Sequence, residues 1–215
     1  MVLNNAKART MAEYLLEIKA VILSLDKPFT WASGIKSPIY CDNRKTLSYP
    51  KVRDFIRSSF ADIIHEEFKG VEVIAGVATA GIPHGVLVAD VLNLPFIYVR
   101  DKAKGHGLEN KIEGTLLKGQ KVFVIEDLIS TGGSSLKAVE AIREAGGEVV
   151  GLGAIFSYGF EAVETAFKNA DCSYFTLSNY DYLIEQAVTN NYIKDADVQL
   201  LQQWKKSPAV FVFKD

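Results

Sequence analysis

The sequence predicts an α/β fold with a central, mainly parallel sheet and flanking helices. Between about residues 50 and 180, short apolar runs alternate with segments of helical spacing, which is typical of parallel strands covered by helices on both faces. Residues 29–44 are rich in Thr, Ser, Tyr and Ile around one glycine and one proline, which indicates an irregular pair of strands. We therefore expect one domain over residues 1–215, with a core of about residues 50–180.

Composition narrows the class of protein. Of the 215 residues, 48% are hydrophobic and 23% are charged, as in ordinary globular domains, and the formal net charge of -2 gives no basic field for nucleic acid or an anionic membrane. Charges interrupt the N-terminal apolar positions, and no window approaches a membrane span. Cys41 and Cys172 are too few for a disulfide framework, which suits a reducing compartment. We expect a cytoplasmic protein that acts on small molecules.

The expected elements follow from spacing and from start and stop signals. Apolar residues at helical spacing predict an amphipathic helix over Ala6–Ser24, and Pro50 suits the first turn of a helix that ends near Phe68. Further strands are expected at Val71–Val77, Phe96–Val99, Lys121–Glu126, Glu148–Phe156, about Tyr174–Leu177 and Ala209–Phe213, and further helices at Gly81–Leu92, Ser134–Ala145, Glu161–Lys168, about Asp181–Thr189 and about Asp195–Lys205.

The most informative stretch lies between the strand at 121–126 and the helix at 134–145. Two adjacent acids, Glu126 and Asp127, precede Ser130–Ser134, which combines three hydroxyls with two glycines. At a helix start, glycines let the backbone approach a ligand, and free N–H groups and hydroxyls bind phosphate. The carboxylates would repel that phosphate, so we expect them to accept hydrogen bonds from hydroxyls, of which a ribose offers two. These features indicate a ribose 5-phosphate.

Two more loops should reach the same cleft, because ligands of such sheets bind beyond the carboxyl ends of the strands. Ala78–Ile82 ends a strand in small residues and begins a helix, which gives a second place for an anion. Arg100–Gly114 is a hydrophilic loop that we interpret as a cationic lid. Two anion sites beside an acid pair match a ribose with a phosphate on C5 and a pyrophosphate on C1. Breaking the C1 bond requires cations and exclusion of water, which Lys104 on a closing loop would supply.

Three segments resemble one enzyme family. Val124–Ser134 resembles the phosphoribosyl pyrophosphate signature of type I phosphoribosyltransferases, and its Glu-Asp form resembles the orotate enzyme in particular. Phe29–Tyr40 is similar to the hood segment of orotate phosphoribosyltransferases, and Arg100–Gly107 is similar to their catalytic loop. The resemblance covers nearly the whole chain and implies the type I phosphoribosyltransferase fold. In that fold a small N-terminal hood, a cap built here mainly from about residues 1–45 with C-terminal elements, lies beside the core of about residues 50–180.

The resemblance also implies a reaction. The enzyme would transfer the 5-phosphoribosyl group of phosphoribosyl pyrophosphate to N1 of orotate, giving orotidine 5'-monophosphate and pyrophosphate in de novo pyrimidine biosynthesis. Mg²⁺ would arrive with the diphosphate rather than on metal ligands of the protein. The family works as a homodimer in which the lid of one subunit reaches into the active site of the other.

Site residues carry over by the same resemblance. The catalytic residues would be Lys104, His106 and Asp127, with Lys104 as the chief cation. Phosphoribosyl pyrophosphate would be bound by Thr79, Ala80, Gly81, Arg100, Lys104, His106, Glu126, Asp127, Leu128, Ile129, Ser130, Thr131, Gly132, Gly133 and Ser134. Orotate would be bound by Lys36, Tyr40 and Ser130.

The chain departs from the family pattern at several cations. Many members have Lys where Ala32 and Ala80 stand, Lys in place of Asp101, and Arg in the segment that reads Ser-Tyr-Gly-Phe at 157–160 here. Three explanations remain open: a lower affinity, a reliance on Mg²⁺ and backbone N–H groups, or a branch of the family with its own pattern.

Four other functions fit the sequence less well. A purine or another pyrimidine phosphoribosyltransferase is opposed only by the hood segment, and a regulator that binds without turnover would need a basic surface or a DNA-binding appendage. A P-loop nucleotidase lacks G-x-x-x-x-G-K-[ST], and a dinucleotide-binding enzyme lacks G-x-G-x-x-G after a strand. His65 and His84 fall in helical patterns and are interpreted as structural, and Trp31 and Trp204 as core or dimer contacts.

Overall fold

The structure, a computed structural model, describes residues 1–31, 33–101 and 111–213. Its helices are α1 (Asn5–Glu17), η1 (a 3-10 helix, Asn43–Ser48), α2 (Pro50–Glu67), α3 (Gly81–Leu92), α4 (Gly133–Glu144), α5 (Glu161–Asn169), α6 (Tyr180–Thr189) and α7 (Asp195–Lys206). Its strands are β1 (Val21–Leu23), β2 (Phe29–Thr30), β3 (Lys36–Ser37), β4 (Ile39–Cys41), β5 (Val73–Val77), β6 (Phe96–Val99), β7 (Ile112–Glu113), β8 (Lys121–Ile129), β9 (Glu148–Ser157) and β10 (Tyr174–Asn179). No described helix combines the length and apolar composition that crossing a membrane requires.

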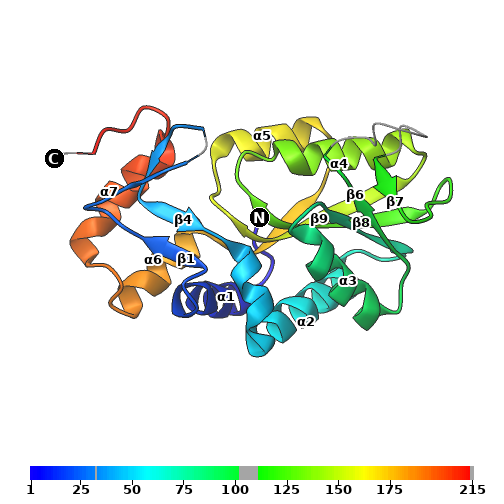
Figure 1. Cartoon of the computed structure of the whole chain (residues 1–215), viewed down its shortest axis with the longest axis horizontal. Coiled ribbons are helices and arrows are strands. Elements are labelled where there is room, and N and C mark those ends of the chain that lie inside the picture. Colours follow the sequence, from blue (N-terminus) through cyan, green and yellow to red (C-terminus); the bar gives the residue numbers. More distant parts are fainter. Residues whose placement is uncertain (32, 102–110, 214–215) are drawn as a thin grey trace.

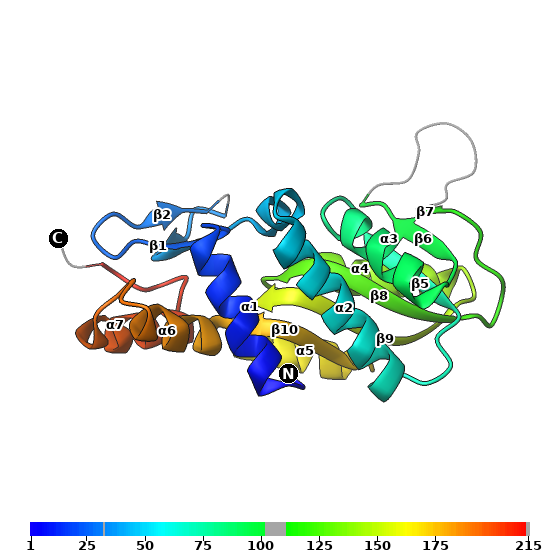
Figure 2. The same ribbon diagram turned by 90° about the horizontal axis from the view of Figure 1, so that it is seen from below.

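A six-stranded sheet forms the core, in the order β10-β9-β8-β5-β6-β7. Neighbouring strands are parallel except β6 and β7, which are antiparallel. Helices α1, α2 and α3 cover one face, and α4 and α5 lie on the other (Figure 1, Figure 2). The predicted α/β class with a mainly parallel sheet is confirmed.

The sheet reverses its order between β5 and β8. From β5 the chain passes through α3 to β6 on one side, and it later returns to β8 on the other side of β5. Because the two following helices, α3 and α4, lie on opposite faces, the carboxyl ends of β5 and β8 open a crevice at this point. The expected ligand loops follow these two strands.

The hood lies beside this core and combines both ends of the chain. Strand β1 pairs with β4 and β2 pairs with β3, both antiparallel, next to α6 and α7 (Figure 1). The indole Nε1 of Trp204 on α7 donates to the carbonyl oxygen of Lys36 at 3.0 Å, and the Trp31 and Trp204 rings meet edge-on at 5.7 Å. C-terminal residues therefore support the N-terminal hairpin, and both tryptophans are core contacts of the hood.

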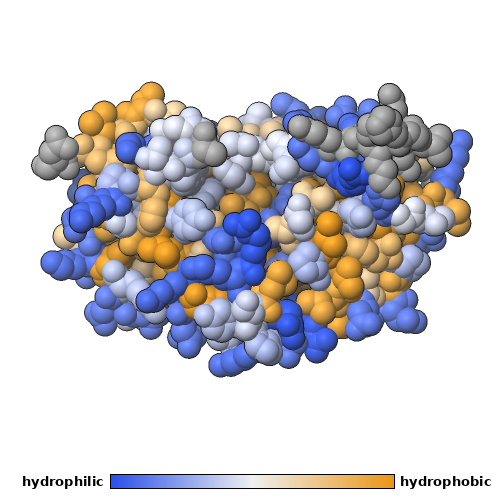
Figure 3. All heavy atoms as spheres, in the orientation of Figure 1, coloured by the Kyte–Doolittle hydropathy of each residue, from blue (hydrophilic) through white to orange (hydrophobic). Residues whose placement is uncertain are grey.

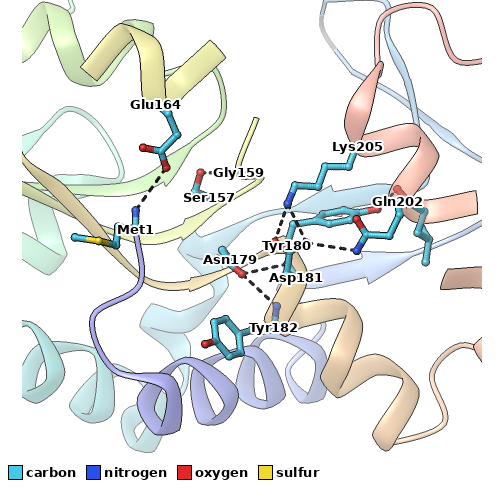
Figure 4. Close-up of polar contacts among 11 residues, drawn as sticks. Met1, Ser157, Gly159, Glu164, Asn179, Tyr180, Asp181, Tyr182, Gln202 and Lys205 are labelled. Carbon is cyan, nitrogen blue, oxygen red and sulfur yellow. Dashed lines mark hydrogen bonds and ion pairs between the residues drawn. The ribbon is translucent and has the colours of Figure 1, made fainter. Parts of the chain in front are cut away.

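Polar contacts fix the C-terminal helices to one another (Figure 4). The Asn179 side chain caps α6 by accepting from the backbone N–H groups of Asp181 and Tyr182, both at 3.1 Å. The Asp181 carboxylate in turn accepts from Lys205 Nζ of α7 at 2.8 and 2.9 Å. These bonds tie α7 to the beginning of α6.

The first helix is shorter than its apolar spacing predicts. It ends at Glu17 rather than at Ser24, and Val21–Leu23 is a strand that pairs with β4. Lys19 adopts a left-handed conformation with a φ of 54°, which ends the helix and turns the chain. The predicted helix boundary is therefore wrong by one short strand.

The predicted C-terminal strand at Ala209–Phe213 is absent. Phe211 and Phe213 pack on the main core cluster, whereas Val210 and Val212 are 76% and 81% exposed. The alternation of a strand is present, but among the described residues no strand pairs with this segment. Hydrophobic alternation alone does not form a strand without a partner.

The segment interpreted as a lid is anchored at both ends. Ile112–Glu113, which the sequence analysis places in the loop, pairs antiparallel with β6, and the Arg100 N–H donates to the Lys111 carbonyl oxygen at 2.8 Å. The stretch 102–110, which includes Lys104 and His106, lies outside the described residues, as does Ala32. Arg100 and Lys111, which flank this stretch, lie beyond the carboxyl end of β6.

Candidate active site

The acid pair lies where β8 continues beyond its partner β5. The ladder between β5 and β8 ends at the pair Gly76 and Ile125, while β8 goes on to Ile129 against β9 alone. Glu126 and Asp127 are therefore in β8 itself, at the edge of the crevice. The predicted strand ends three residues too early, but the acids stand at the carboxyl end as expected.

Helix α3 begins directly beside these acids because Gly81 has no side chain. A Cβ atom at Gly81 would lie 2.5 Å from the carbonyl oxygen of Ile125, so only glycine allows this approach. Among the described residues, no side chain caps α3, and the preceding Thr79 is exposed, after a cis peptide bond between Ala78 and Thr79. The uncapped N–H groups of the first turn can hold an anion here.

Helix α4 begins on the other side of the acid pair. Gly132 has a φ of 81°, and a Cβ atom there would lie 2.9 Å from the Phe167 ring. Both the backbone conformation and the lack of space therefore favour glycine at this position. Within the described part of the chain the helix has no side-chain cap, and Thr131, Gly133 and Ser134 are exposed at its start. The structure thus has the expected arrangement of strand, glycine loop and uncapped helix.

Glu126 is almost completely buried. Only 5% of the residue is exposed, and its carboxylate accepts from the Asp127 backbone N–H at 3.1 Å and from the hydroxyls of Ser134 and Ser135 at 3.4 and 3.2 Å. Burial raises the pKa of Glu126 above its usual range, and the neighbouring Asp127 carboxylate raises it further. Glu126 therefore anchors the start of α4 as well as facing its neighbour.

Asp127 is half-buried where the core meets the hood. Burial raises the pKa of its carboxyl group, while the guanidinium of Arg44 opposes that shift. Its backbone carbonyl oxygen accepts from Asn43 Nδ2 at 2.6 Å. Burial raises the pKa of the Tyr158 hydroxyl, and the nearby Asp127 carboxylate raises it further. Residues of the hood thus face Asp127.

The hood residues expected to bind orotate lie on neighbouring short strands. Lys36 is exposed on β3 and its Nζ donates to Thr30 Oγ1 at 2.8 Å. Tyr40 is exposed on β4, with its ring 5.6 Å from that of Phe29. Both side chains are accessible to a ligand.

At the lid, the Arg100 guanidinium pairs with Glu113. The distance from Nη1 to the Glu113 carboxylate is 3.2 Å, and both side chains are partly exposed. A pyrophosphate would have to compete with this ion pair for Arg100.

Comparison with known proteins adds to this geometry. The family model of the phosphoribosyl transferase domain matches residues 47–182. The chain belongs to this family. An orotate phosphoribosyltransferase of Listeria innocua serovar 6a is 60% identical over 203 residues, which cover 94% of this chain and 97% of that protein. One of Bacteroides thetaiotaomicron is 58% identical over 94% of this chain and 95% of its own length.

A solved structure agrees with this assignment. The crystal structure of orotate phosphoribosyltransferase from Aeropyrum pernix is 25% identical and has a TM-score of 0.73, covering 86% of this chain and 99% of that one. The phosphoribosyltransferase described here therefore shares both sequence and fold with orotate enzymes.

The carboxylates in the crevice of this phosphoribosyltransferase suit Mg²⁺ only when a substrate supplies further oxygen ligands. Among the described residues, no group of three or more His, Cys, Asp or Glu side chains could hold a metal ion. The crevice offers Glu126 and Asp127, and Mg²⁺ commonly combines one or two carboxylates with phosphate oxygens of a substrate.

Sequence reasoning missed four residues of the site: Asn43, Arg44, Ser135 and Tyr158. The run Asp42-Asn43-Arg44 directly after a short apolar strand was the available signal for the first two. Ser135 follows the motif directly and lies nine positions from its partner Glu126, so its place at the start of the helix was a signal. Tyr158 stands in the segment 157–160, where the departure from the family pattern was the available signal.

Proposed function

We propose that this protein transfers the 5-phosphoribosyl group from phosphoribosyl pyrophosphate to N1 of orotate, giving orotidine 5'-monophosphate and pyrophosphate in de novo pyrimidine biosynthesis. The observation that carries the proposal is the acid pair of β8 between two uncapped helix starts, in a chain 60% identical to an orotate phosphoribosyltransferase. Two anion sites separated by hydrogen-bond acceptors suit a sugar with phosphate groups at both ends.

Each end of the substrate has a place in this arrangement. The N–H groups and hydroxyls at the start of α4, from Ser130 to Ser134, would hold the 5-phosphate. Asp127, with Glu126 behind it, would accept hydrogen bonds from the ribose hydroxyls. The start of α3, at Thr79–Gly81, would hold the diphosphate. Lys36, Tyr40 and Ser130 would then face the orotate ring from the hood side.

The chemical step separates a diphosphate from C1 of the ribose as N1 of orotate attacks. Mg²⁺, when bound with the diphosphate, supplies positive charge to the leaving group. Arg100, Lys104 and His106 would stabilise the same negative charge as it develops, which lowers the barrier rather than tightening ground-state binding. The hood and the lid segment would exclude water from the developing positive charge on the sugar.

We further propose that the active unit is a cytoplasmic homodimer with shared active sites. Two apolar side chains on α3, Val86 and Val91, are 45% and 46% exposed. Hydrophobic residues also gather over the region of α3 on the face shown in Figure 3. A second copy of the chain that covers α3 would bring its lid segment close to this crevice.

A steady-state assay tests the reaction. Purified protein with Mg²⁺ and phosphoribosyl pyrophosphate should form the 5'-monophosphate with orotate and not with uracil, adenine, guanine or hypoxanthine. Asp127→Asn should raise the KM for phosphoribosyl pyrophosphate, because an amide oxygen is a weaker acceptor than a carboxylate. Turnover of a purine base alone, or none with orotate, would remove the proposal.

A further inference from the structure

We propose that Asn43 is a positioning residue that holds the end of β8, and with it Asp127, in register with the hood. The inference rests on the proposed function and assigns a role to a residue outside the phosphate-binding and lid segments. Asn43 is the first residue of η1, directly after the hood strand β4 and Asp42. It would act on the substrate only through Asp127.

The Asn43 amide is buried and uses both of its ends. Only 1% of the residue is exposed. Its Nδ2 donates to the Asp127 carbonyl oxygen at 2.6 Å, and its Oδ1 accepts from Cys41 Sγ at 3.3 Å. A buried amide with a partner at each end has one orientation, so it fixes the carbonyl that it contacts.

The contact lies at a stretch of β8 that needs support. Beyond Ile125 the strand no longer pairs with β5, and only β9 continues alongside it. The Asn43 side chain supplies a donor in this stretch. It therefore fixes the peptide plane of Asp127, from which the carboxylate that faces the ribose extends.

The same short helix also reaches α3. Thr46 Oγ1 donates to the Asn43 carbonyl oxygen at 2.6 Å and lies 3.4 Å from Nε2 of His84, a buried residue of α3. Helix η1 thus contacts the hood strand, the acid pair and the helix whose first turn would hold the diphosphate. The proposed sites for orotate, ribose and diphosphate are thus all in contact with η1.

This arrangement predicts a specific kinetic effect. Without the Asn43 amide, the Asp127 peptide can rotate, and displacement of a binding group by about 1 Å can cost on the order of 100-fold in rate. Asn43→Ala should lower kcat/KM for phosphoribosyl pyrophosphate by about 10-fold or more. The loss should lie mainly in KM, since the ribose contact is made in the ground state.

A double-mutant cycle with Asp127→Asn separates positioning from general damage. If Asn43 acts through Asp127, Asn43→Ala combined with Asp127→Asn should be no worse than Asp127→Asn alone. Multiplying losses would overturn the proposal, as would an Asn43→Ala enzyme with unchanged kcat/KM. An inactive wild-type enzyme would instead refute the proposed function.

Ser178→Ala is the matched control. The Ser178 hydroxyl is also fully buried and donates to a backbone carbonyl oxygen, that of Ala8 at 2.9 Å, but it lies between β10 and α1 away from the crevice. This variant should lose thermal stability, keep its kcat/KM, and combine with Asp127→Asn without any coupling. If Asn43→Ala does not fold, Asn43→Ser serves in its place, because its hydroxyl is too short to reach Asp127.

Discussion

At the scale of single residues, the protonation state of Glu126 and Asp127 gives a testable prediction. Burial raises the pKa of Glu126 and of Asp127, so the empty site should carry a shared proton near neutral pH. Ribose hydroxyl donors and Mg²⁺ both favour ionised carboxylates. Binding of Mg²⁺ and phosphoribosyl pyrophosphate at pH 7 should therefore release protons, which calorimetry in buffers of different ionisation enthalpy would measure.

The substrate also exchanges protons with solvent when it binds. The number of protons released by the acid pair is therefore the difference between the release measured for the wild type and that measured for a variant of the pair. Glu126→Gln cannot ionise at this position and should release fewer protons than the wild type under identical conditions. Equal release by the two proteins would show that the pair is already fully ionised in the empty site.

His84 should make the protein sensitive to acid. Burial lowers the pKa of His84 to about 4 from 6.5. The Thr46 hydroxyl donates its hydrogen to the Asn43 carbonyl oxygen, so the Nε2–H of His84 donates to Thr46 Oγ1. The other ring nitrogen of His84, Nδ1, has no partner among the described residues. The neutral ring thus fits its surroundings.

The pH dependence follows from that shift. Between pH 6.5 and 4 the unfolded chain binds a proton that the folded protein does not, so the free energy of unfolding should fall with pH by about 3 kcal/mol in total. Urea denaturation over this range checks the slope. His84→Gln should flatten it, whereas His65→Gln at an exposed position should not; an unchanged slope in His84→Gln would contradict the account.

At the scale of elements, the sequence predicted those features that depend only on residues within one segment. The strand, glycine loop and helix from 122 to 145 were predictable, because apolar period and glycine conformation act within the segment. The strand expected at Ala209–Phe213 failed, because a strand depends on a partner elsewhere in the chain. Asn43 was missed for the same reason, since its contact with Asp127 spans 84 positions.

The close packing of α3 on β8 gives a prediction about stability. Gly81→Ala would place a methyl group 2.5 Å from the Ile125 carbonyl oxygen, so the helix start must shift. We expect a loss of about 1–3 kcal/mol of unfolding free energy and weaker binding of the diphosphate. Chemical denaturation and calorimetry would measure the two effects.

Gly133→Ala controls for the addition of a methyl group to a helix start. At Gly133 a Cβ atom would meet only Thr131 Oγ1, at 3.9 Å, so its unfolding free energy should change little. Equal destabilisation of the two variants would mean that the contact with β8 is not what selects glycine at position 81.

At the scale of the whole molecule, the proposed sharing of active sites between two subunits predicts complementation. Lys104→Ala removes the proposed lid cation and Asp127→Asn weakens the proposed ribose site, so each homodimer should have very low activity when phosphoribosyl pyrophosphate is far below the KM of the Asp127→Asn enzyme. After mixing and exchange of subunits, hybrid dimers contain one intact site, and activity should recover to about a quarter of wild type if exchange is random. No recovery despite demonstrated exchange would mean that each subunit uses its own lid.

The positions of the substrate groups depend on the crevice between β5 and β8. A crystal structure with Mg²⁺, phosphoribosyl pyrophosphate and orotate tests this most directly. We predict the 5-phosphate at the start of α4, the diphosphate at the start of α3, and the ribose hydroxyls within hydrogen-bond distance of Asp127. A sugar bound elsewhere, or one whose hydroxyls face away from Asp127, would contradict the account.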